Sequence, residues 1–307
     1  MWLEITGNCQ LECSHCYAGS GPTRGHGILS ADQWMQTLTE AAIAGVEQVQ
    51  FIGGEPTSHP ALPRLIAHAC QLGLRVEVFS NLFSIRDHVW DALTQPEVSL
   101  ATSYYSAGAE VHDTITRRSG SHERTKANIA EAVRRGIQLR VGLTRLSEDQ
   151  DISGAVEELV SLGVLRDDIR VDDLRGVGRG AASGGGTTED ELCGNCANGV
   201  LAIMPDGTVQ PCVFSRDATF EVGNIAVDGL TSLLNGDRLH RMREDLTSVF
   251  LERGITRSGG GPGCSPACVP AGNCNPVVNP PPCNPQVGHP PRPEPPGRPP
   301  GPVCNPY

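Results

Sequence analysis

Short apolar runs alternate with helix-like segments through the first half of the chain. Runs rich in β-branched residues predict six strands, over 2–6, 48–52, 75–79, 98–103, 138–144 and 168–172. Apolar residues at helical spacing predict helices between them, over 30–45, 62–72, 85–93, 121–135 and 151–162. Because such alternation is typical of a parallel sheet with crossover helices, the first domain is expected to be α/β.

The pattern changes after the sixth strand. A glycine-rich segment, 176–186, is expected to be a linker that carries the chain off the first domain. Two short apolar runs, 201–204 and 208–212, then flank Pro205-Asp206-Gly207. A Pro-Asp-Gly turn between two such runs predicts a β-hairpin.

A helix is expected over 230–246, with a break near Asn235-Gly236, and Pro and Gly dominate beyond Ser258. By composition alone this tail would be disordered. Its cysteines oppose that interpretation, because a bound metal cluster can order a segment that lacks an apolar core. The expected organisation is a domain over 1–180, a linker over 181–192 and a second domain over 193–307.

Composition and charge exclude several classes of protein. The 307 residues are 38% hydrophobic, enough for a substantial core, and the net charge of -11 argues against a nucleic-acid or anionic membrane surface. No apolar run approaches the roughly 20 residues that cross a bilayer. The first apolar run is also too short for a signal peptide, so we expect a cytoplasmic protein.

Twelve cysteines in such a chain indicate metal ligation more than disulfides, because the cytosol keeps thiols reduced. Three lie at the start, eight lie from Cys193 onward, and Cys70 stands alone in the apolar stretch 65–70. Cys70 is therefore expected to be a small residue of the core.

The first three cysteines, Cys9, Cys13 and Cys16, are spaced by three and then two residues. Three thiols in this pattern can hold an iron-sulfur cluster and leave one iron open to a substrate or cofactor. Two alternatives remain at this point: a zinc site completed by His15, and a set of buried structural cysteines.

The cysteine motif is followed by Gly53-Gly54-Glu55-Pro56, and together the two motifs resemble the radical SAM enzymes. The resemblance implies a partial (β/α)6, TIM-like barrel whose loops form one mouth over a 4Fe-4S cluster. In that family the open iron chelates S-adenosylmethionine, and one electron cleaves its sulfonium to give a 5'-deoxyadenosyl radical. The cofactor carries this chemistry, and the protein supplies position and exclusion.

The resemblance also implies which residues contact S-adenosylmethionine. Gly53, Gly54 and Glu55 would hold its amino group, with Glu55 accepting N–H bonds. Contacts to the ribose or carboxylate would come from Ser80, Ser103 and Arg117, and His15 would pack near the adenine. Gly178-Arg179-Gly180 resembles the Gly-Arg element that often ends the barrel in this family.

The late cysteines resemble the SPASM extension of radical SAM proteins, in which a Gly precedes a Cys by five residues, as Gly207 precedes Cys212. The resemblance implies two auxiliary 4Fe-4S clusters in a Cys-rich, C-terminal SPASM-type extension. One would be bound by Cys193, Cys196, Cys212 and Cys283, and the other by Cys264, Cys268, Cys274 and Cys304. The spacings 264–268 and 274–283 are longer than those usual in the family.

Three functions are compatible with these motifs. The leading hypothesis is maturation of a ribosomally made peptide, as in anaerobic sulfatase-maturating enzymes and related maturases. An electron donor such as ferredoxin or flavodoxin would supply the electron. The chain begins almost at Cys9, so the peptide would be recognised either by a separate leader-binding protein or by the barrel mouth.

The alternative enzyme hypothesis is oxidation, decarboxylation or epimerisation of a small sugar-type or nucleoside-type intermediate. The third is an electron carrier or cluster scaffold, for which Gly53-Gly54-Glu55 would have no purpose. Family dehydrogenases often place a carboxylate beside an auxiliary cluster, but here Val213 follows Cys212 and the nearest downstream carboxylate is Asp217. No residue is therefore assigned as catalytic.

Overall fold

The computed structural model describes residues 1–183, 191–192 and 194–252. The chain divides into two units, Met1–Pro276 and Val277–Tyr307, and every described residue belongs to the first.

Six parallel strands form the centre of the fold, and all six were predicted from the sequence. They are β1 (Trp2–Thr6), β2 (Gln48–Gly53), β3 (Arg75–Phe79), β4 (Val98–Tyr104), β5 (Gln138–Arg145) and β6 (Ile169–Asp173). Each strand pairs in parallel with the next along the chain. This order brings the carboxyl ends of all six strands to the same edge of the sheet, where the loops that follow them meet.

The predicted hairpin forms as β7 (Ala202–Ile203) and β8 (Thr208–Gln210), and a short β9 (Gly223–Asn224) pairs with β8. β7 also pairs in parallel with β1, so the sheet continues past β1 in the order β6-β5-β4-β3-β2-β1-β7-β8-β9. Among the described residues no pairing of β6 with β9 closes it, so the nine strands form an open sheet.

Five of the six helices that connect the parallel strands were predicted. They are α1 (Ala31–Ile43), α2 (Leu62–Gln71), α3 (Asp87–Leu93), α5 (Ser121–Arg134) and α6 (Ile152–Ser161). The missed one, α4 (Ala109–Thr116), buries only His112 and Thr116, so it carries no apolar stripe that periodicity could detect. Ser30 and Gln33 form the capping box that begins α1.

The extension carries α7 (Ile225–Asp228), α8 (Leu230–Leu234) and α9 (Asp237–Glu252). The break between α8 and α9 falls at Asn235-Gly236, as predicted. Short 3-10 helices lie at η1 (Pro56–Ser58), η2 (Arg166–Asp168), η3 (Gly178–Ser183) and η5 (Ala218–Phe220).

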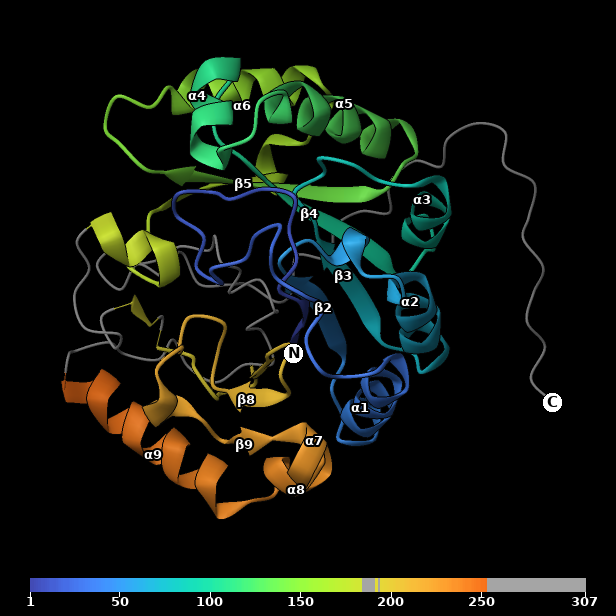
Figure 1. Cartoon of the computed structure of the whole chain (residues 1–307), viewed down its shortest axis with the longest axis vertical. Helices are drawn as coiled ribbons and strands as arrows, with labels where there is room; N and C mark the ends of the chain where they lie inside the picture. The colour runs from blue at the N-terminus through green and yellow to red at the C-terminus, as the bar shows by residue number, and fades with distance from the viewer. Residues whose placement is uncertain (184–190, 193, 253–307) are drawn as a thin grey trace. The chain divides into compact units, whose positions relative to one another are not determined.

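Apolar side chains fill the space between the sheet and its helices. Figure 1 shows α1, α2, α3 and α5 outside the strands, with α9 beside β8 and β9. Val76 and Val78 on β3 are buried among the core residues, while the alternate residue Glu77 points to the opposite face. There Arg140 donates to Glu77 through Nε and Nη2, both at 2.7 Å. The face of the sheet away from these helices is therefore partly polar.

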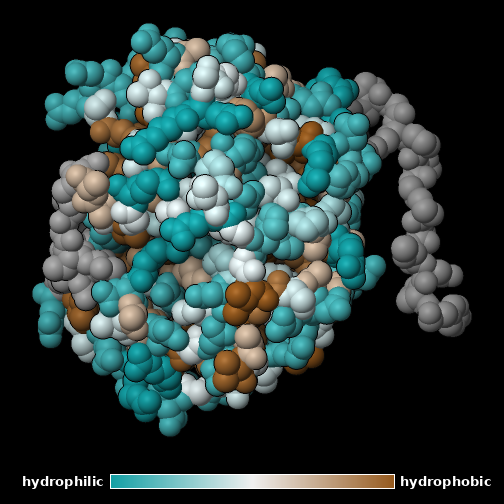
Figure 2. Space-filling view, viewed as in Figure 1, coloured by the Kyte–Doolittle hydropathy of each residue, from teal (hydrophilic) through white to brown (hydrophobic). Residues whose placement is uncertain are grey.

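Most of the face in Figure 2 is hydrophilic, with a small hydrophobic group over the region of α7, where Val227 is 83% exposed. No helix in the described part of the chain is long and apolar enough to cross a membrane. Cys70 is half-buried and packs against the edge of the core.

Candidate functional site

The three early cysteines lie on a loop that follows β1 and is fixed by backbone hydrogen bonds. Glu12 N donates to Thr116 O at 3.1 Å and Ser14 N donates to Ile115 O at 2.9 Å, which ties the loop to the end of α4. We call residues 9–16 the cysteine loop. The position of its thiols therefore depends on α4 as well as on β1.

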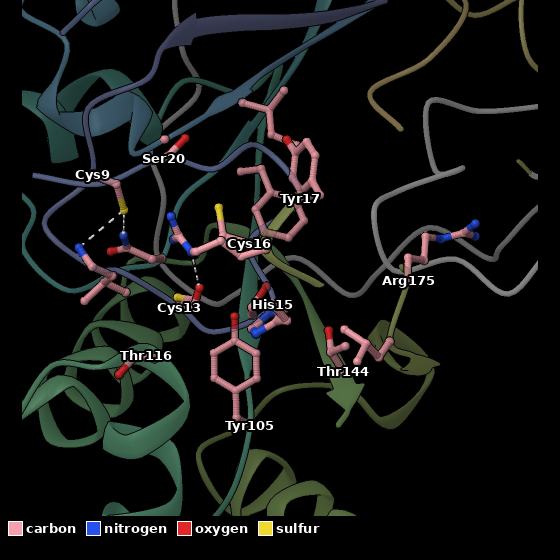
Figure 3. Close-up of a pocket in the computed structure, with 18 of the residues that line it drawn as sticks. Cys9, Cys13, His15, Cys16, Tyr17, Ser20, Tyr105, Thr116, Thr144 and Arg175 are labelled. Atoms are coloured by element: carbon pink, nitrogen blue, oxygen red, sulfur yellow. Dashed lines mark hydrogen bonds between the residues drawn. The ribbon is translucent and has the colours of Figure 1, made fainter. Parts of the chain in front are cut away.

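All three thiols line one cavity at the carboxyl edge of the parallel strands. Figure 3 shows Cys9, Cys13 and Cys16 on one side of this cavity and Arg175 on the other. Burial raises the pKa of Cys9, and burial followed by the neighbouring Cys16 raises the pKa of Cys13 to about 12. Thiolates bind metals and thiols do not. Because burial disfavours the thiolate form, a bound cation is needed to stabilise the cysteine thiolates in this loop.

The arrangement does not favour the zinc alternative. In residues 1–183, 191–192 and 194–252, no three His, Cys, Asp or Glu side chains converge closely enough to hold a single metal ion. The three thiols instead share the wall of a cavity, together with His15. This donor set fits a cluster that spans several sulfurs.

Gly53 and Gly54 bring β2 against the residues that precede Cys9. Gly54 N donates to Thr6 O and Glu55 N donates to Asn8 O, both at 2.7 Å. A Cβ on Gly54 would lie 2.1 Å from Asn8 O, and Gly53 has φ +120° with Thr6 O only 2.5 Å from the position of a Cβ. Only glycine allows this approach, and both glycines line the cavity.

Glu55 is buried and its carboxylate is held by four protein donors. Oε1 accepts from Thr57 N (3.0 Å), Thr57 Oγ1 (2.7 Å) and Ser80 Oγ (2.8 Å), and Oε2 accepts from Asn81 N (2.7 Å). Burial raises the pKa of Glu55, and these bonds oppose that rise. Glu55 is not among the residues that line the cavity, so in this structure its carboxylate joins η1 to the loop after β3.

The structure brings some of the other predicted contacts together and separates one. Ser103 lines the cavity, and Ser80 lies behind it, fully buried against Glu55. Arg117 ends α4 in the left-handed conformation, with φ 54°, and its side chain is exposed outside the cavity.

Several residues that line the cavity carry a buried polar atom without a hydrogen-bond partner among the described residues. The atoms are His15 Nδ1, Ser20 Oγ, His112 Nδ1 and Arg179 Nη2. Burying such atoms unpaired costs about 1–3 kcal/mol each. A polar ligand in the cavity would supply the missing partners, so the site fits S-adenosylmethionine beside a cluster.

Sequence reasoning missed several residues that line the cavity: Asn81, Tyr105, His112, Thr116, Thr125, Thr144, Asp173, Arg175 and Phe214. Asn81, Tyr105, Thr144 and Asp173 lie at or just after the carboxyl ends of four strands. That position is the signal that could have identified them. The rings of His15 and Tyr105 pack edge to face, with their centroids 5.0 Å apart. The two rings line the cavity together with Cys13.

The glycine-rich segment 176–186 was expected to be a linker, but its first residues pack against the cysteine loop. Arg179 N donates to Cys16 O at 2.9 Å, and Arg179 Nε donates to Cys13 O at 2.8 Å. A Cβ on Gly178 would lie 2.2 Å from Tyr17 O. η3 therefore closes one side of the site.

Two cysteines of the extension, Cys196 and Cys212, lie apart from the cavity. Cys196 and Cys212 are 0% and 3% exposed, and their sulfurs lie 3.4 Å apart. This contact is compatible with their expected sharing of one cluster. The other expected ligands lie outside the described residues: Cys193, Cys264, Cys268, Cys274, Cys283 and Cys304.

Comparison with known proteins gives a consistent assignment. The family model of the radical SAM superfamily matches residues 3–151, and that of an iron-sulfur cluster-binding domain, SPASM, matches residues 190–257. The subtilosin biosynthesis protein AlbA of Bacillus subtilis is 26% identical over 282 residues, which cover 81% of this chain and 62% of AlbA. The PqqA peptide cyclase of Rhodopseudomonas palustris is 32% identical over 133 residues, 43% of this chain and 35% of the cyclase.

Among solved structures, Streptococcus suis SuiB bound to S-adenosylmethionine has a TM-score of 0.66 and 16% identity, over 80% of this chain and 67% of SuiB. At this identity the likeness concerns the fold alone. The chain spans about a third to two thirds of the length of the two curated relatives above. Besides its cysteine loop and its Gly53-Gly54 contact, the chain therefore carries a radical SAM domain and a SPASM iron-sulfur domain.

Proposed function

We propose that this protein is a radical SAM enzyme that modifies a ribosomally made precursor peptide. The observation that carries the proposal is the single cavity that holds all three thiols of the cysteine loop beside Gly53 and Gly54. In this proposal Cys9, Cys13 and Cys16 hold a 4Fe-4S cluster. With S-adenosylmethionine bound, that cluster supplies the one-electron chemistry that generates a substrate-oxidising radical.

The chain's own residues position the cofactor and exclude water. The backbone of Gly53 and Gly54 lies in the cavity wall, where no side chain keeps a ligand away. In this proposal Ser103, which lines the cavity, would contact the ligand, whereas Ser80 acts through Glu55. The positive charge of Arg179 lowers the pKa of Cys13, opposing the effect of burial, and so favours the thiolate that binds iron.

The peptide substrate is supported by the relatives. AlbA acts in biosynthesis of the bacteriocin subtilosin, the PqqA cyclase acts on a peptide, and SuiB has been crystallised with its precursor peptide SuiA. By analogy the substrate enters at the cavity mouth. The further partners in this proposal are a one-electron donor such as ferredoxin or flavodoxin and a separate leader-binding protein.

The proposal gives the extension two auxiliary 4Fe-4S clusters. Cys196 and Cys212 share the first with Cys193 and Cys283, and the contact between their sulfurs supports that pairing. The second takes the remaining late cysteines, Cys264, Cys268, Cys274 and Cys304. The domain boundaries that follow are 1–180 and 193–307.

The test is an anaerobic assay of reconstituted protein with S-adenosylmethionine, dithionite and the precursor peptide encoded nearest to it. We expect 5'-deoxyadenosine and a change in the peptide's mass or stereochemistry. In the C9A/C13A/C16A variant we expect no deoxyadenosine and a loss of about four irons per chain from about twelve. Deoxyadenosine with an unchanged peptide would point to a small-molecule substrate, and no deoxyadenosine from wild type would refute the proposal.

A further inference from the structure

Three exposed arginines gather beside the cysteine loop. Arg117 and Arg118 lie in the loop between α4 and α5, and Arg124 lies in the first turn of α5. We call these three residues the arginine patch. Within the described residues none of them forms an ion pair, whereas Arg75 and Arg134 elsewhere on the surface pair with glutamates.

One aromatic ring separates the arginine patch from the cluster ligands. The guanidinium carbons of Arg118 and Arg124 lie 5.3 and 4.8 Å from the centre of the Phe83 ring. Phe83 is 7% exposed and packs in one apolar cluster with Cys9 and Leu11. The surface is therefore only one side chain away from the thiols at this point.

The backbone joins the patch to the same loop. Thr116 is the last residue of α4, directly before Arg117, and its carbonyl oxygen accepts from Glu12 N. The preceding carbonyl, Ile115 O, accepts from Ser14 N. Asp113 then fixes the turn into α5, because its carboxylate accepts from Gly120 N at 2.6 Å and from His122 N at 2.9 Å. The arginines thus have a defined place relative to the cysteine loop.

Charge determines what this surface can attract. The whole chain carries a net charge of -11, so an acidic protein is repelled by most of its surface. Three carboxylates lie near the patch: Glu12, in the cysteine loop, Asp113, and Glu123, which lies 3.2 Å from His122 Nδ1. The Asp113 carboxylate accepts from Gly120 N and His122 N, so it is engaged within the turn. Within the described residues the three guanidinium groups form no ion pair, so they are the groups available to an acidic partner beside Phe83.

We propose that the arginine patch is the docking surface for a small acidic one-electron carrier protein. The inference rests on the proposed function, because it requires a cluster at the cysteine loop. The donor is oxidised by one electron, and the cluster is reduced by one electron across the short path past Phe83.

Binding and catalysis test this docking surface separately. Purified flavodoxin is titrated against reconstituted wild type, R118E/R124E and the control R75E/R134E. The control reverses two exposed arginines at the start of β3 and the end of α5, at the opposite end of the sheet from the cavity. At low salt we expect R118E/R124E to weaken flavodoxin binding at least about tenfold, with the control and R118K/R124K close to wild type.

Deoxyadenosine production is then compared with reduced flavodoxin and with dithionite, which needs no docking surface. We expect R118E/R124E to lose most of the flavodoxin-driven rate and to keep the dithionite-driven rate. Unchanged flavodoxin binding in R118E/R124E would overturn the docking surface. So would an equal loss with both reductants, which would assign the patch to substrate binding or to the cluster. If wild type fails with dithionite, the proposed function fails, and the binding titration still decides whether flavodoxin docks on the patch.

Discussion

The two groups of cysteines in the described chain occupy opposite environments. The thiols of the cysteine loop line a cavity together with His15 and His112, each of which has a buried ring nitrogen without a partner among the described residues. Cys196 and Cys212 are fully enclosed and do not line that cavity. The cysteine loop therefore lies where a cofactor that it binds could meet a substrate. Cys196 and Cys212 are shielded from the substrate.

A short turn nevertheless connects the two groups. Ser215 Oγ donates to Cys212 O at 2.8 Å, and Arg216 Nε donates to Val213 O at 3.0 Å. From the same turn Phe214 lines the cavity, and Arg216 pairs with the buried Glu4 of β1. A change at Cys212 can thus reach the wall of the cavity without altering the cysteine loop.

The largest effect is expected from Gly54→Ala, which would displace the backbone next to the cysteine loop. The added Cβ would lie 2.1 Å from Asn8 O, so β2 and the residue before Cys9 must separate. Because a misplacement of about 1 Å can cost about 100-fold in rate, we expect deoxyadenosine production to fall at least that far. The assay is dithionite-driven cleavage of S-adenosylmethionine, with iron content measured in parallel.

Gly25→Ala is the matched control for Gly54→Ala. A Cβ on Gly25 meets nothing within 4 Å, and its backbone lies outside the left-handed region. We expect its activity and iron content to remain close to wild type. Equal losses in the two variants would mean that the contact between Gly54 and Asn8 does not position the site.

An intermediate effect is expected from Cys212→Ala, which removes one thiol of the buried pair Cys196 and Cys212. We expect a loss of about four irons per chain, because one auxiliary cluster would lack a ligand. Cleavage of S-adenosylmethionine should persist, since Cys212 lies outside the cavity, while formation of modified peptide should fail. Measuring deoxyadenosine and peptide product in one reaction separates the two outcomes, and loss of both would contradict the distinction between the groups.

The sequence predicted the parts of the site that local pattern determines. Strand periodicity located all six parallel strands, because a period of two is a local property of the chain. The family resemblance pointed to Gly53 and Gly54, and the structure shows why these positions need glycine, since a Cβ would collide with Thr6 O or Asn8 O.

The parts that tertiary contacts determine were not predictable in the same way. The resemblance placed Gly178-Arg179-Gly180 at the end of the barrel, but no local pattern indicated that Arg179 packs on the cysteine loop more than 160 positions away in sequence. β7 joins β1 through a parallel pairing that two residues, Ala202 and Ile203, are too few to indicate. The family pattern placed Arg117 at the cofactor, but the left-handed end of α4 turns it outward.

The smallest effect is expected from Asp113→Asn. Asp113 fixes the turn after α4, the helix whose end is hydrogen-bonded to the cysteine loop. Burial raises the pKa of Asp113, but the N–H groups of His122 and Gly120 and the Ser121 hydroxyl outweigh it and hold the pKa below its usual value. The carboxylate is thus favoured in the folded state, so its stabilisation is present above about pH 4 and is lost as the pH falls through the depressed pKa. We expect Asp113→Asn to cost about 1–2 kcal/mol at neutral pH, because its amide cannot accept all three bonds.

Thermal unfolding from pH 7 down to pH 3 checks this expectation against a matched variant in the extension. Asp217→Asn removes a similar cap, in which Asp217 Oδ1 accepts from Thr219 N at 2.9 Å, but on the exposed surface at η5. Asp113→Asn should lower the melting temperature more than Asp217→Asn at neutral pH, and its difference from wild type should shrink toward pH 3. Because Asp113 fixes the turn between α4 and α5, its loss should also weaken iron retention at the cysteine loop, which Asp217→Asn should leave unchanged. A pH-independent difference between Asp113→Asn and wild type would show that the charge of Asp113 does not provide this support.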